Sequence, residues 1–268
     1  MEVAILCGGK GTRMRDVATD IPKPMVPIGG KPILWHIMKG FAQHGFKKFI
    51  LCLGYKGWVI KRYFADYYMA NCDLTVNLAS PEATTFHNFN ADENWEVTLA
   101  DTGEESMTAY RIRAIEKYVT GKELFVTYGD GIGNVDITQL LNFHRSHNKT
   151  ATVTAVRPPG RFGEMVIDNH QVNNFVEKPQ ISSGSINGGF FVFNRSFFSH
   201  LQDDPTITLE SGPLTSLANQ GELMAYEHNG FWQPVDNARD YKFVNDLWDQ
   251  GNAPWKTWDQ PNRLRLAG

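Results

Sequence analysis

A turn of closely spaced glycines near the amino terminus carries two cationic side chains. Gly8, Gly9 and Gly11 can adopt positive φ and allow the backbone to approach a ligand without a side-chain clash. Backbone N–H groups at a turn that ends a strand point toward an anion. Lys10 adds a positive charge, and the guanidinium of Arg13 can donate to two phosphate oxygens at once. The turn therefore favours phosphate binding over an ordinary tight turn.

Two familiar phosphate loops do not match this turn. The Rossmann fingerprint for dinucleotides needs a third glycine at the place where Met14 stands. The P-loop ends in Gly-Lys-Ser/Thr after four free positions, and the chain has no such string. A dinucleotide-dependent oxidoreductase is therefore disfavoured.

Three further charged residues stand in or beside turns. Lys23 lies between two prolines that restrict its backbone, although an ordinary surface lysine is the simpler interpretation on local grounds. Asp130 follows an expected strand in a glycine turn, and Asp236 lies just beyond Pro234. Each acid alone is more typical of a turn residue that caps local backbone. The two acids could converge, because ligands of α/β sheets bind at the carboxyl ends of parallel strands.

The elements that must position these residues alternate along the first 155 positions. Expected strands at 3–7, 48–53, 124–128 and 151–156 alternate with expected helices that begin at Pro32 and span 57–69 and 137–147. This alternation predicts a mostly parallel α/β sheet. Beyond Pro158 shorter strands are expected at 164–167, 172–176, 189–193 and 223–227, with helices at 214–219 and 239–248. The polar segment 80–94 indicates an irregular loop.

Composition excludes several classes of protein. The chain has 268 residues, 42% of them hydrophobic, and a net charge of -3, without the basic footprint of a nucleic-acid binder. No apolar run is long enough for a transmembrane helix, and Glu2 stands where a signal peptide carries bases. Three cysteines without a CxxC pair fit a reducing compartment. We therefore expect a cytoplasmic protein with no nucleic-acid or membrane partner.

The run from Gly8 to Leu34, GGKGTRMRDVATDIPKPMVPIGGKPIL, resembles the amino-terminal signature of the sugar nucleotide pyrophosphorylases. Later motifs are similar to the glucose-1-phosphate cytidylyltransferase branch of that family, and they cover nearly the whole chain. Among them are the motifs at 53–57, 128–131, 158–163, 176–179, 186–191, 230–236 and 253–258. The resemblance implies a Rossmann-like mixed, mostly parallel sheet flanked by helices, of the nucleotide-diphospho-sugar transferase type, with a β-rich carboxyl-terminal portion.

The resemblance also implies a role for particular residues. The nucleotide site falls on Leu6, Cys7, Gly8, Gly9, Lys10, Gly11, Thr12, Arg13, Lys23, Ser106, Arg111 and Gly129. The sugar-phosphate site falls on Tyr128, Glu177, Lys178 and Asn187, and the Mg²⁺ ligands on Asp130 and Asp236. Arg13, Lys23 and Lys178 are the expected catalytic cations.

The activity implied is the coupling of CTP and α-D-glucose 1-phosphate to CDP-glucose, with release of pyrophosphate. One nucleotidyltransferase domain is expected over 1–268, with a nucleotide-binding half at 1–157, a sugar-phosphate-binding half at 158–251 and a carboxyl-terminal arm at 252–268. The family resemblance further implies a homo-oligomer, a hexamer or another multimer, and an association with bacterial surface polysaccharide.

Two positions depart from the branch pattern. Ala109 and Tyr110 stand where two glycines are usual, and Gly212 stands where an acid is expected before Pro-Leu. Tyr110 could crowd the ligand or stack on it. These departures leave open a related enzyme that uses dTTP, UTP or another phosphorylated acceptor. A non-catalytic nucleotide sensor is the alternative from another class.

Overall fold

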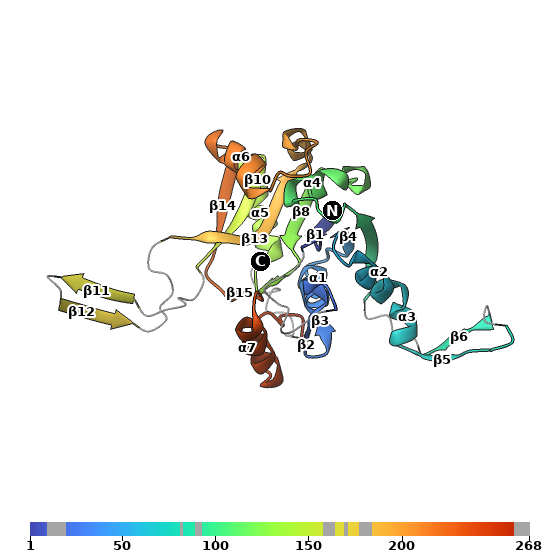
Figure 1. The fold of residues 1–268 in the computed structure, drawn as a ribbon. Helices are drawn as coiled ribbons and strands as arrows, with labels where there is room; N and C mark the ends of the chain where they lie inside the picture. The colour runs from blue at the N-terminus through green and yellow to red at the C-terminus, as the bar shows by residue number, and fades with distance from the viewer. Residues whose placement is uncertain are drawn as a thin grey trace, which may run out of the picture.

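The computed structural model describes residues 1–9, 20–80, 83–88, 93–157, 164–168, 171–176 and 184–259. For 164–168 and 172–176 only the backbone is described. The centre of the molecule is a seven-stranded sheet (Figure 1). Its strands lie in the order β14 (Leu223–His228), β10 (Ala151–Val156), β13 (Ile186–Asn194), β8 (Glu123–Tyr128), β1 (Glu2–Leu6), β4 (Lys48–Leu53) and β7 (Glu96–Asp101).

All neighbouring strands of this sheet run parallel, except that β13 is antiparallel to both β8 and β10. Strands from both halves of the chain therefore hydrogen-bond within one sheet. Residues of β1, β4 and β8 are almost entirely buried and apolar, as expected for parallel strands covered on both faces. The expected mixed, mostly parallel sheet is confirmed.

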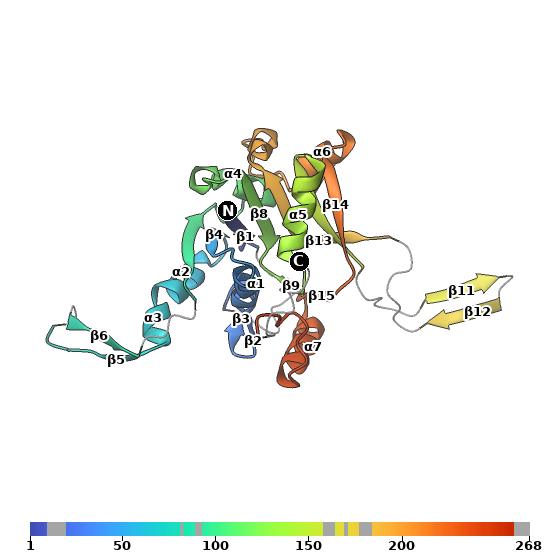
Figure 2. The ribbon, with the colours of Figure 1, turned by 180° about the vertical axis from the view of Figure 1, so that it is seen from behind.

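Helices cover both faces of the sheet. Alternate residues of β1 point to opposite sides, so that Val3 and Ile5 join one apolar cluster and Ala4 and Leu6 the other. The first cluster includes residues of α1 (Ile33–Ala42), α2 (Gly57–Ala65), α5 (Ile137–His147) and α7 (Ala238–Asp249). The second includes residues of α4 (Thr108–Ala114), α6 (Thr215–Asn219) and a 3₁₀ helix at Arg195–His200. Figure 1 shows α4 in front of the sheet and Figure 2, from behind, shows α5 in front.

Two short antiparallel pairs border the carboxyl ends of the parallel strands. The first joins β2 (Pro27–Ile28) and β3 (Lys31–Pro32), and the second joins β9 (Gly131–Gly133) and β15 (Trp232–Pro234). The second pair joins two parts of the chain about 100 residues apart, and Val235 N donates to Asp130 O at 2.9 Å. It therefore brings the segment that follows β8 beside the segment that precedes α7.

Two hairpins lie away from this body. One joins β5 (Asp73–Thr75) and β6 (Thr85–His87), and the other joins β11 (Glu164–Asp168) and β12 (Gln171–Val176). Figure 1 draws them on opposite sides of the central sheet. The other short elements are α3 (Tyr67–Ala70), 3₁₀ helices at Lys23–Met25 and Glu116–Tyr118, and a π-helical turn at Glu210–Leu214.

Several expected elements have the predicted bounds, among them the strands at 48–53 and 151–156 and the helix at 137–147. The expected helix over 57–69 is wrong as a single element, because it breaks at Asp66 into α2 and α3. The irregular loop expected over 80–94 contains β6. The pattern did not predict β7 or α4.

The described part of the carboxyl-terminal segment packs on the chain's own first helix. Trp255 is buried and donates from Nε1 to His36 Nδ1 at 3.4 Å. Trp248 and Trp258 also contact the ring of His36. The aromatic cluster therefore holds residues 253–258 against α1. Within the described part of the chain, no helix is both long and apolar enough to cross a membrane.

Candidate active site

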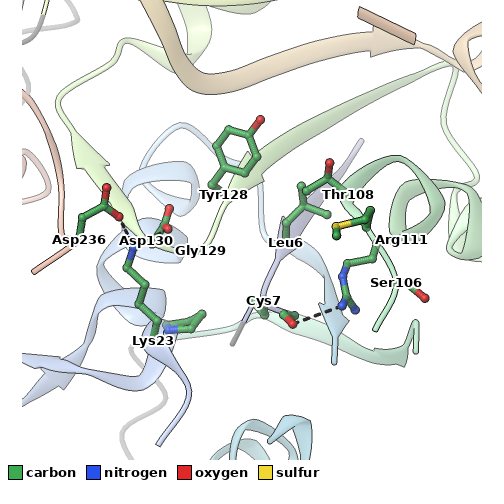
Figure 3. Close-up of a pocket in the computed structure, with 14 residues that line it drawn as sticks. Leu6, Cys7, Lys23, Ser106, Thr108, Arg111, Tyr128, Gly129, Asp130 and Asp236 are labelled. Atoms are coloured by element: carbon green, nitrogen blue, oxygen red, sulfur yellow. Dashed lines mark hydrogen bonds and ion pairs between the residues drawn. The ribbon is translucent and has the colours of Figure 1, made fainter. Parts of the chain in front are cut away.

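A cavity of about 320 Å³ opens at the carboxyl ends of β1 and β8. These neighbouring strands pair Leu6 with Tyr128, and Gly129 N donates to Leu6 O at 3.0 Å. Helices leave this edge of the sheet on both faces, which makes it the usual place for a ligand in an α/β protein. The cavity is lined by Leu6, Cys7, Gly8, Gly9, Lys23, Pro24, Ser106, Met107, Thr108, Arg111, Tyr128, Gly129, Asp130 and Asp236 (Figure 3).

Arg111 supports one wall of the cavity. It is only 4% exposed, and its guanidinium donates to the carbonyl oxygens of Leu53, Gly103, Glu104 and Gly8 and to Thr102 Oγ1 at distances of 2.7–3.2 Å. A Cβ on Gly8 would lie 2.1 Å from Arg111 Cζ. Position 8 therefore needs glycine because the guanidinium occupies the space of a side chain. Arg111 ties the end of β1 to the ends of β4 and β7.

Cys7 lies in the cavity wall as a buried thiol. Burial, with the neighbouring Cys52, raises its pKa well above the ordinary value. A thiol that stays protonated is a poor nucleophile. Cys7 therefore contributes shape and apolar surface to the site.

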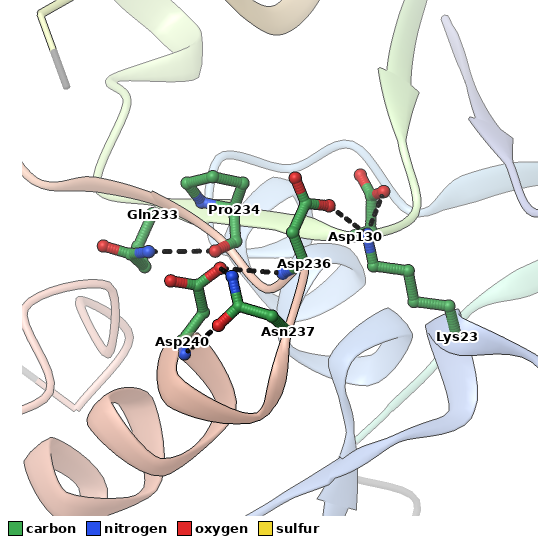
Figure 4. Close-up of polar contacts among 7 residues, drawn as sticks. All are labelled: Lys23, Asp130, Gln233, Pro234, Asp236, Asn237 and Asp240. Carbon is green, nitrogen blue, oxygen red and sulfur yellow. Dashed lines mark hydrogen bonds and ion pairs between the residues drawn. The ribbon is translucent and has the colours of Figure 1, made fainter. Parts of the chain in front are cut away.

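Lys23 stands between two carboxylates (Figure 4). Its Nζ donates to Asp130 Oδ2 at 2.7 Å and also pairs with Asp236 Oδ1. The lysine is held by the 3₁₀ turn between Pro22 and Val26, and its side chain is only 11% exposed. Asp236 precedes α7, and its backbone N–H donates to Asp240 Oδ2 at 3.1 Å. Residues 23, 130 and 236 thus meet from three separate parts of the chain.

This donor set is suited to a hard divalent cation. Mg²⁺ is usually bound through one or two carboxylates together with substrate phosphates, rather than by a cage of protein ligands. Asp130 and Asp236 provide two carboxylates whose oxygens already share one cation, the Lys23 ammonium. In the described ranges no group of three or more His, Cys, Asp or Glu forms a metal site. The pair therefore fits Mg²⁺ bound jointly with a phosphate ligand.

A row of polar side chains borders the cavity beside Tyr128. Asn187 Nδ2 donates to the Tyr128 hydroxyl at 3.3 Å, and that hydroxyl donates in turn to Glu210 Oε1. Thr108 Oγ1 donates to Glu210 Oε2 at 3.4 Å. Burial, and then the hydrogen bond to Glu210, raise the pKa of Tyr128 above its ordinary value. The phenol therefore keeps its proton.

The cavity brings together most of the residues that the sequence predicts for the nucleotide and metal sites. Asn187 reaches its edge through Tyr128. Lys10, Gly11, Thr12, Arg13, Glu177 and Lys178 lie outside the described residues. The sequence does not predict Pro24, Met107, Thr108 and Glu210, although 107–108 and 210 stand beside the two departures from the branch pattern.

The expectation that Tyr110 could crowd or stack on the ligand is not supported by the geometry. Tyr110 lines a separate surface groove with Arg113, Lys117 and Arg195, whereas Arg111 lines the cavity. Residues 110 and 113 share one face of α4, and residue 111 lies on another. Gly212 is also absent from the described lining, and a Cβ there would lie 2.6 Å from Ile207 Cγ2.

The sheet, the cavity at its carboxyl edge and the paired carboxylates define an α/β protein of the class that binds ligands at this edge. A model of the nucleotidyl transferase family matches residues 2–249, and the chain belongs to this family. A glucose-1-phosphate cytidylyltransferase from Salmonella typhi is 51% identical over 260 residues, which cover 97% of this chain and 100% of that protein. The resemblance inferred from the motifs is thereby confirmed.

Two more distant similarities concern a relative in sequence and a solved structure. The mannose-1-phosphate guanylyltransferase catalytic subunit beta of Drosophila pseudoobscura pseudoobscura is 30% identical over 244 residues, which are 88% of this chain and 59% of that protein. The structure of UTP-bound UGPase from Acinetobacter baumannii has a TM-score of 0.66 at 15% identity, and the match covers 92% of each chain. The second likeness concerns the fold alone.

Proposed function

We propose that the protein couples CTP and α-D-glucose 1-phosphate to CDP-glucose and releases pyrophosphate. The observation that carries the proposal is the convergence of Lys23, Asp130 and Asp236 beside the glycine turn that follows β1. This arrangement suits a triphosphate and a metal ion at one end of a cavity. The full-length similarity to the cytidylyltransferase of Salmonella typhi supports CTP and glucose 1-phosphate as the substrates.

The reaction forms a bond between a phosphate oxygen of glucose 1-phosphate and the α-phosphorus of CTP. The bond from the α-phosphorus to the β-phosphate breaks in line, and pyrophosphate leaves. The sugar phosphate is already ionised at neutral pH, so the chain needs no covalent nucleophile. Positioning alone can contribute roughly 7–11 kcal/mol toward such a step. The protonated thiol of Cys7 agrees with a direct transfer.

Both substrates are polyanions, so cations must offset their repulsion. Bound Mg²⁺, held by Asp130 and Asp236, would neutralise phosphate charge and orient the α-phosphate. Lys23, which stands beside both acids, would turn toward the triphosphate and donate to its oxygens. We assign Arg13 and Lys10 to the triphosphate and Lys178 to the sugar phosphate, with Glu177 and Asn187 at the sugar hydroxyls.

Ser106, Arg111 and Gly129 complete the proposed nucleotide site. Arg111 donates hydrogen bonds to backbone oxygens of the protein, among them Gly8 O. We therefore propose that it supports the glycine turn rather than contacting the nucleotide. Gly129 allows the backbone that follows β8 to lie close to the end of β1, because a Cβ at position 129 would lie 2.9 Å from Leu6 O. Both residues act on the nucleotide by shaping the backbone around it.

Pyrophosphate release measured with four NTPs and a panel of sugar 1-phosphates tests the proposal. We expect the highest kcat/KM with CTP and glucose 1-phosphate in the presence of Mg²⁺. Faster turnover with dTTP or UTP would identify a related nucleotidyltransferase instead. Binding of nucleotide without turnover of any pair would indicate a sensor.

We further propose that the protein works as a homo-oligomer in the cytoplasm. Several exposed apolar side chains lie in the segment from α2 to β6, among them Trp58, which is 62% exposed, and Leu78, which is 92% exposed. Contiguous exposed apolar surface is typical of protein interfaces. The buried free thiols of Cys7 and Cys52 suit a reducing compartment. Light scattering of the purified protein tests the assembly, and a monomeric mass would contradict it.

A further inference from the structure

One acidic side chain stands at the edge of the cavity, away from the paired carboxylates. Glu210 begins the π-helical turn Glu210–Leu214, and its side chain is exposed. Both described hydrogen-bond partners of its carboxylate, Tyr128 and Thr108, line the cavity. Single π-helical turns are rare and occur often at functional sites. Glu210 was not among the residues predicted for either substrate.

The surrounding chain fixes the position of this carboxylate from two sides. Leu209 N donates to Thr108 Oγ1 at 2.6 Å, and Met107 N donates to Pro205 O at 2.8 Å. The segment before Glu210 is therefore bound along the start of α4. On the other side, the ring of Tyr128 lies against Gly189, where a Cβ would come within 2.4 Å of Tyr128 Cδ2. A carboxylate supported in this way can select among ligands.

Among the described side chains of this row, Glu210 has the most hydrogen-bonding capacity left for a ligand. The Tyr128 hydroxyl has committed its single proton to Glu210 and accepts from Asn187. Asn187 Oδ1 accepts from Gly189 N at 2.8 Å. A carboxylate has about four acceptor positions, and the described contacts of Glu210 use two of them. Glu210 therefore retains exposed acceptors for a ligand that donates hydrogen bonds.

The negative charge of Glu210 also determines which end of a bound ligand lies beside it. A carboxylate repels a phosphate group and accepts hydrogen bonds from hydroxyls. The hydroxyl of Tyr128, which bonds Glu210, points away from Lys23 (Figure 3), and Lys23 with the glycine turn suits the phosphates. A molecule with a phosphate at one end and hydroxyls at the other would therefore bind in a single orientation. A sugar 1-phosphate has this composition.

We propose that Glu210 is a specificity-determining residue that accepts hydrogen bonds from hydroxyl groups of the sugar ring. This inference rests on the proposed function and extends it to a residue that the sequence did not single out. Tyr128, Thr108 and Asn187 hold the carboxylate in place. One deoxy analogue should have nearly the same kcat/KM in the wild type and in Glu210→Ala. The hydroxyl that this analogue lacks is the one that Glu210 contacts.

Kinetics with deoxy sugars test the proposal. We would measure kcat/KM for glucose 1-phosphate and for its 2-, 3-, 4- and 6-deoxy analogues at saturating CTP. The proteins are the full-length wild type, Glu210→Ala, Glu210→Gln and the control Glu227→Ala, which removes an exposed glutamate from β14. Glu210→Ala is expected to lower kcat/KM for glucose 1-phosphate about 10–100-fold, the loss typical of a hydrogen bond to a charged group.

The KM for CTP should stay within about threefold of the wild-type value, because the proposal places Glu210 at the sugar and not at the nucleotide. For one deoxy analogue the ratio of wild-type to Glu210→Ala activity should fall below about threefold, since the contact is already absent. Glu210→Gln keeps one accepting oxygen and should recover part of the activity. Glu227→Ala should match the wild type throughout.

Three results would count against the role of Glu210 or against the proposed function. Equal losses of Glu210→Ala activity with glucose 1-phosphate and all four deoxy analogues would overturn the role of Glu210 and leave the proposed function intact. A rise in the KM for CTP as large as that for the sugar phosphate would do the same. A wild type that releases no pyrophosphate with any of these substrates would overturn the proposed function itself.

Discussion

The ammonium of Lys23 lies 2.7 Å from Asp130 Oδ2 and pairs at the same time with Asp236. One lysine therefore occupies the space between the two acids to which we assign Mg²⁺. Its charge balances part of their mutual repulsion when no metal is bound. We therefore expect metal binding to displace the ammonium of Lys23 toward the triphosphate, where it can donate to phosphate oxygens.

Replacing Lys23 with methionine should strengthen metal binding by the free protein and weaken catalysis. Removal of the ammonium leaves two adjacent carboxylates without their shared cation, so Mn²⁺ should bind about tenfold more tightly without nucleotide. Mn²⁺ titration followed by electron paramagnetic resonance checks this, and kcat should fall by at least tenfold. Lys242→Met, which removes an exposed lysine paired with Asp246, is the control. Unchanged or weaker Mn²⁺ binding by Lys23→Met would argue against competition for the carboxylates.

Asp130→Ala should abolish measurable turnover while the fold is kept. The variant loses one of the two proposed metal ligands, and we expect kcat to fall about 10³-fold. Initial rates over a range of Mg²⁺ concentrations measure the effect. Asp246→Ala, an exposed aspartate on α7, should retain full activity. Recovery of Asp130→Ala activity in excess Mg²⁺ would be incompatible with the metal assignment.

Two glycines of the same turn should respond differently to alanine. At position 8 a Cβ would meet the Arg111 guanidinium at 2.1 Å, whereas at position 9 no described atom lies within 4 Å. We expect Gly8→Ala to lower the free energy of unfolding by roughly 1–3 kcal/mol through overpacking. Gly9→Ala should change it by less than about 0.5 kcal/mol. Urea unfolding of both variants provides the comparison, and equal stabilities would argue against the close packing of Arg111 on Gly8.

Because His36 is buried, we expect the folded protein to lose stability in mild acid. Burial lowers its pKa from 6.5 to about 4, and its Nε2–H donates to Ile28 O at 2.9 Å. Because the unfolded chain takes up the proton first, this stabilisation is complete above pH 6.5 and is lost as the pH falls toward 4.

The loss amounts to about 2 kcal/mol at pH 5. Urea midpoints at pH 8 and pH 5 measure it, with His36→Gln and the exposed His87→Gln as a matched pair. The part of the pH dependence due to His36 should disappear only in the first variant. An unchanged pH dependence in His36→Gln would contradict the assignment.

The sequence predicts the parts of the site that depend on local motifs. The strand that ends at the glycine turn, the strand before Asp130 and the fold class follow from short-range pattern and from family resemblance. The pairing of Lys23 with Asp130 and Asp236 joins residues separated by 107 and 213 positions, and no local pattern indicates it. The resemblance assigned those residues to phosphate and metal without indicating their direct contact.

There are physical reasons why the sequence pattern does not indicate α4 or the position of Glu210. The helix α4 has only seven residues, and its buried face includes Arg111, a charge that hides the amphipathic pattern. Glu210 stands in a five-residue π-helical turn, for which no periodicity exists at that length. The departure of Tyr110 from the family pattern indicates a candidate ligand contact, but its place on α4 turns it away from the cavity and into a separate groove.

The fate of isotopic oxygen tests the proposed reaction most directly. Glucose 1-phosphate labelled with ¹⁸O in the three non-bridging oxygens of its phosphate is incubated with CTP, Mg²⁺ and the protein, and the products are analysed by mass spectrometry. Attack of the sugar phosphate on the α-phosphorus predicts CDP-glucose that retains all of the label and pyrophosphate that contains none. Label in the pyrophosphate, or no CDP-glucose from the folded protein, would contradict the proposed function.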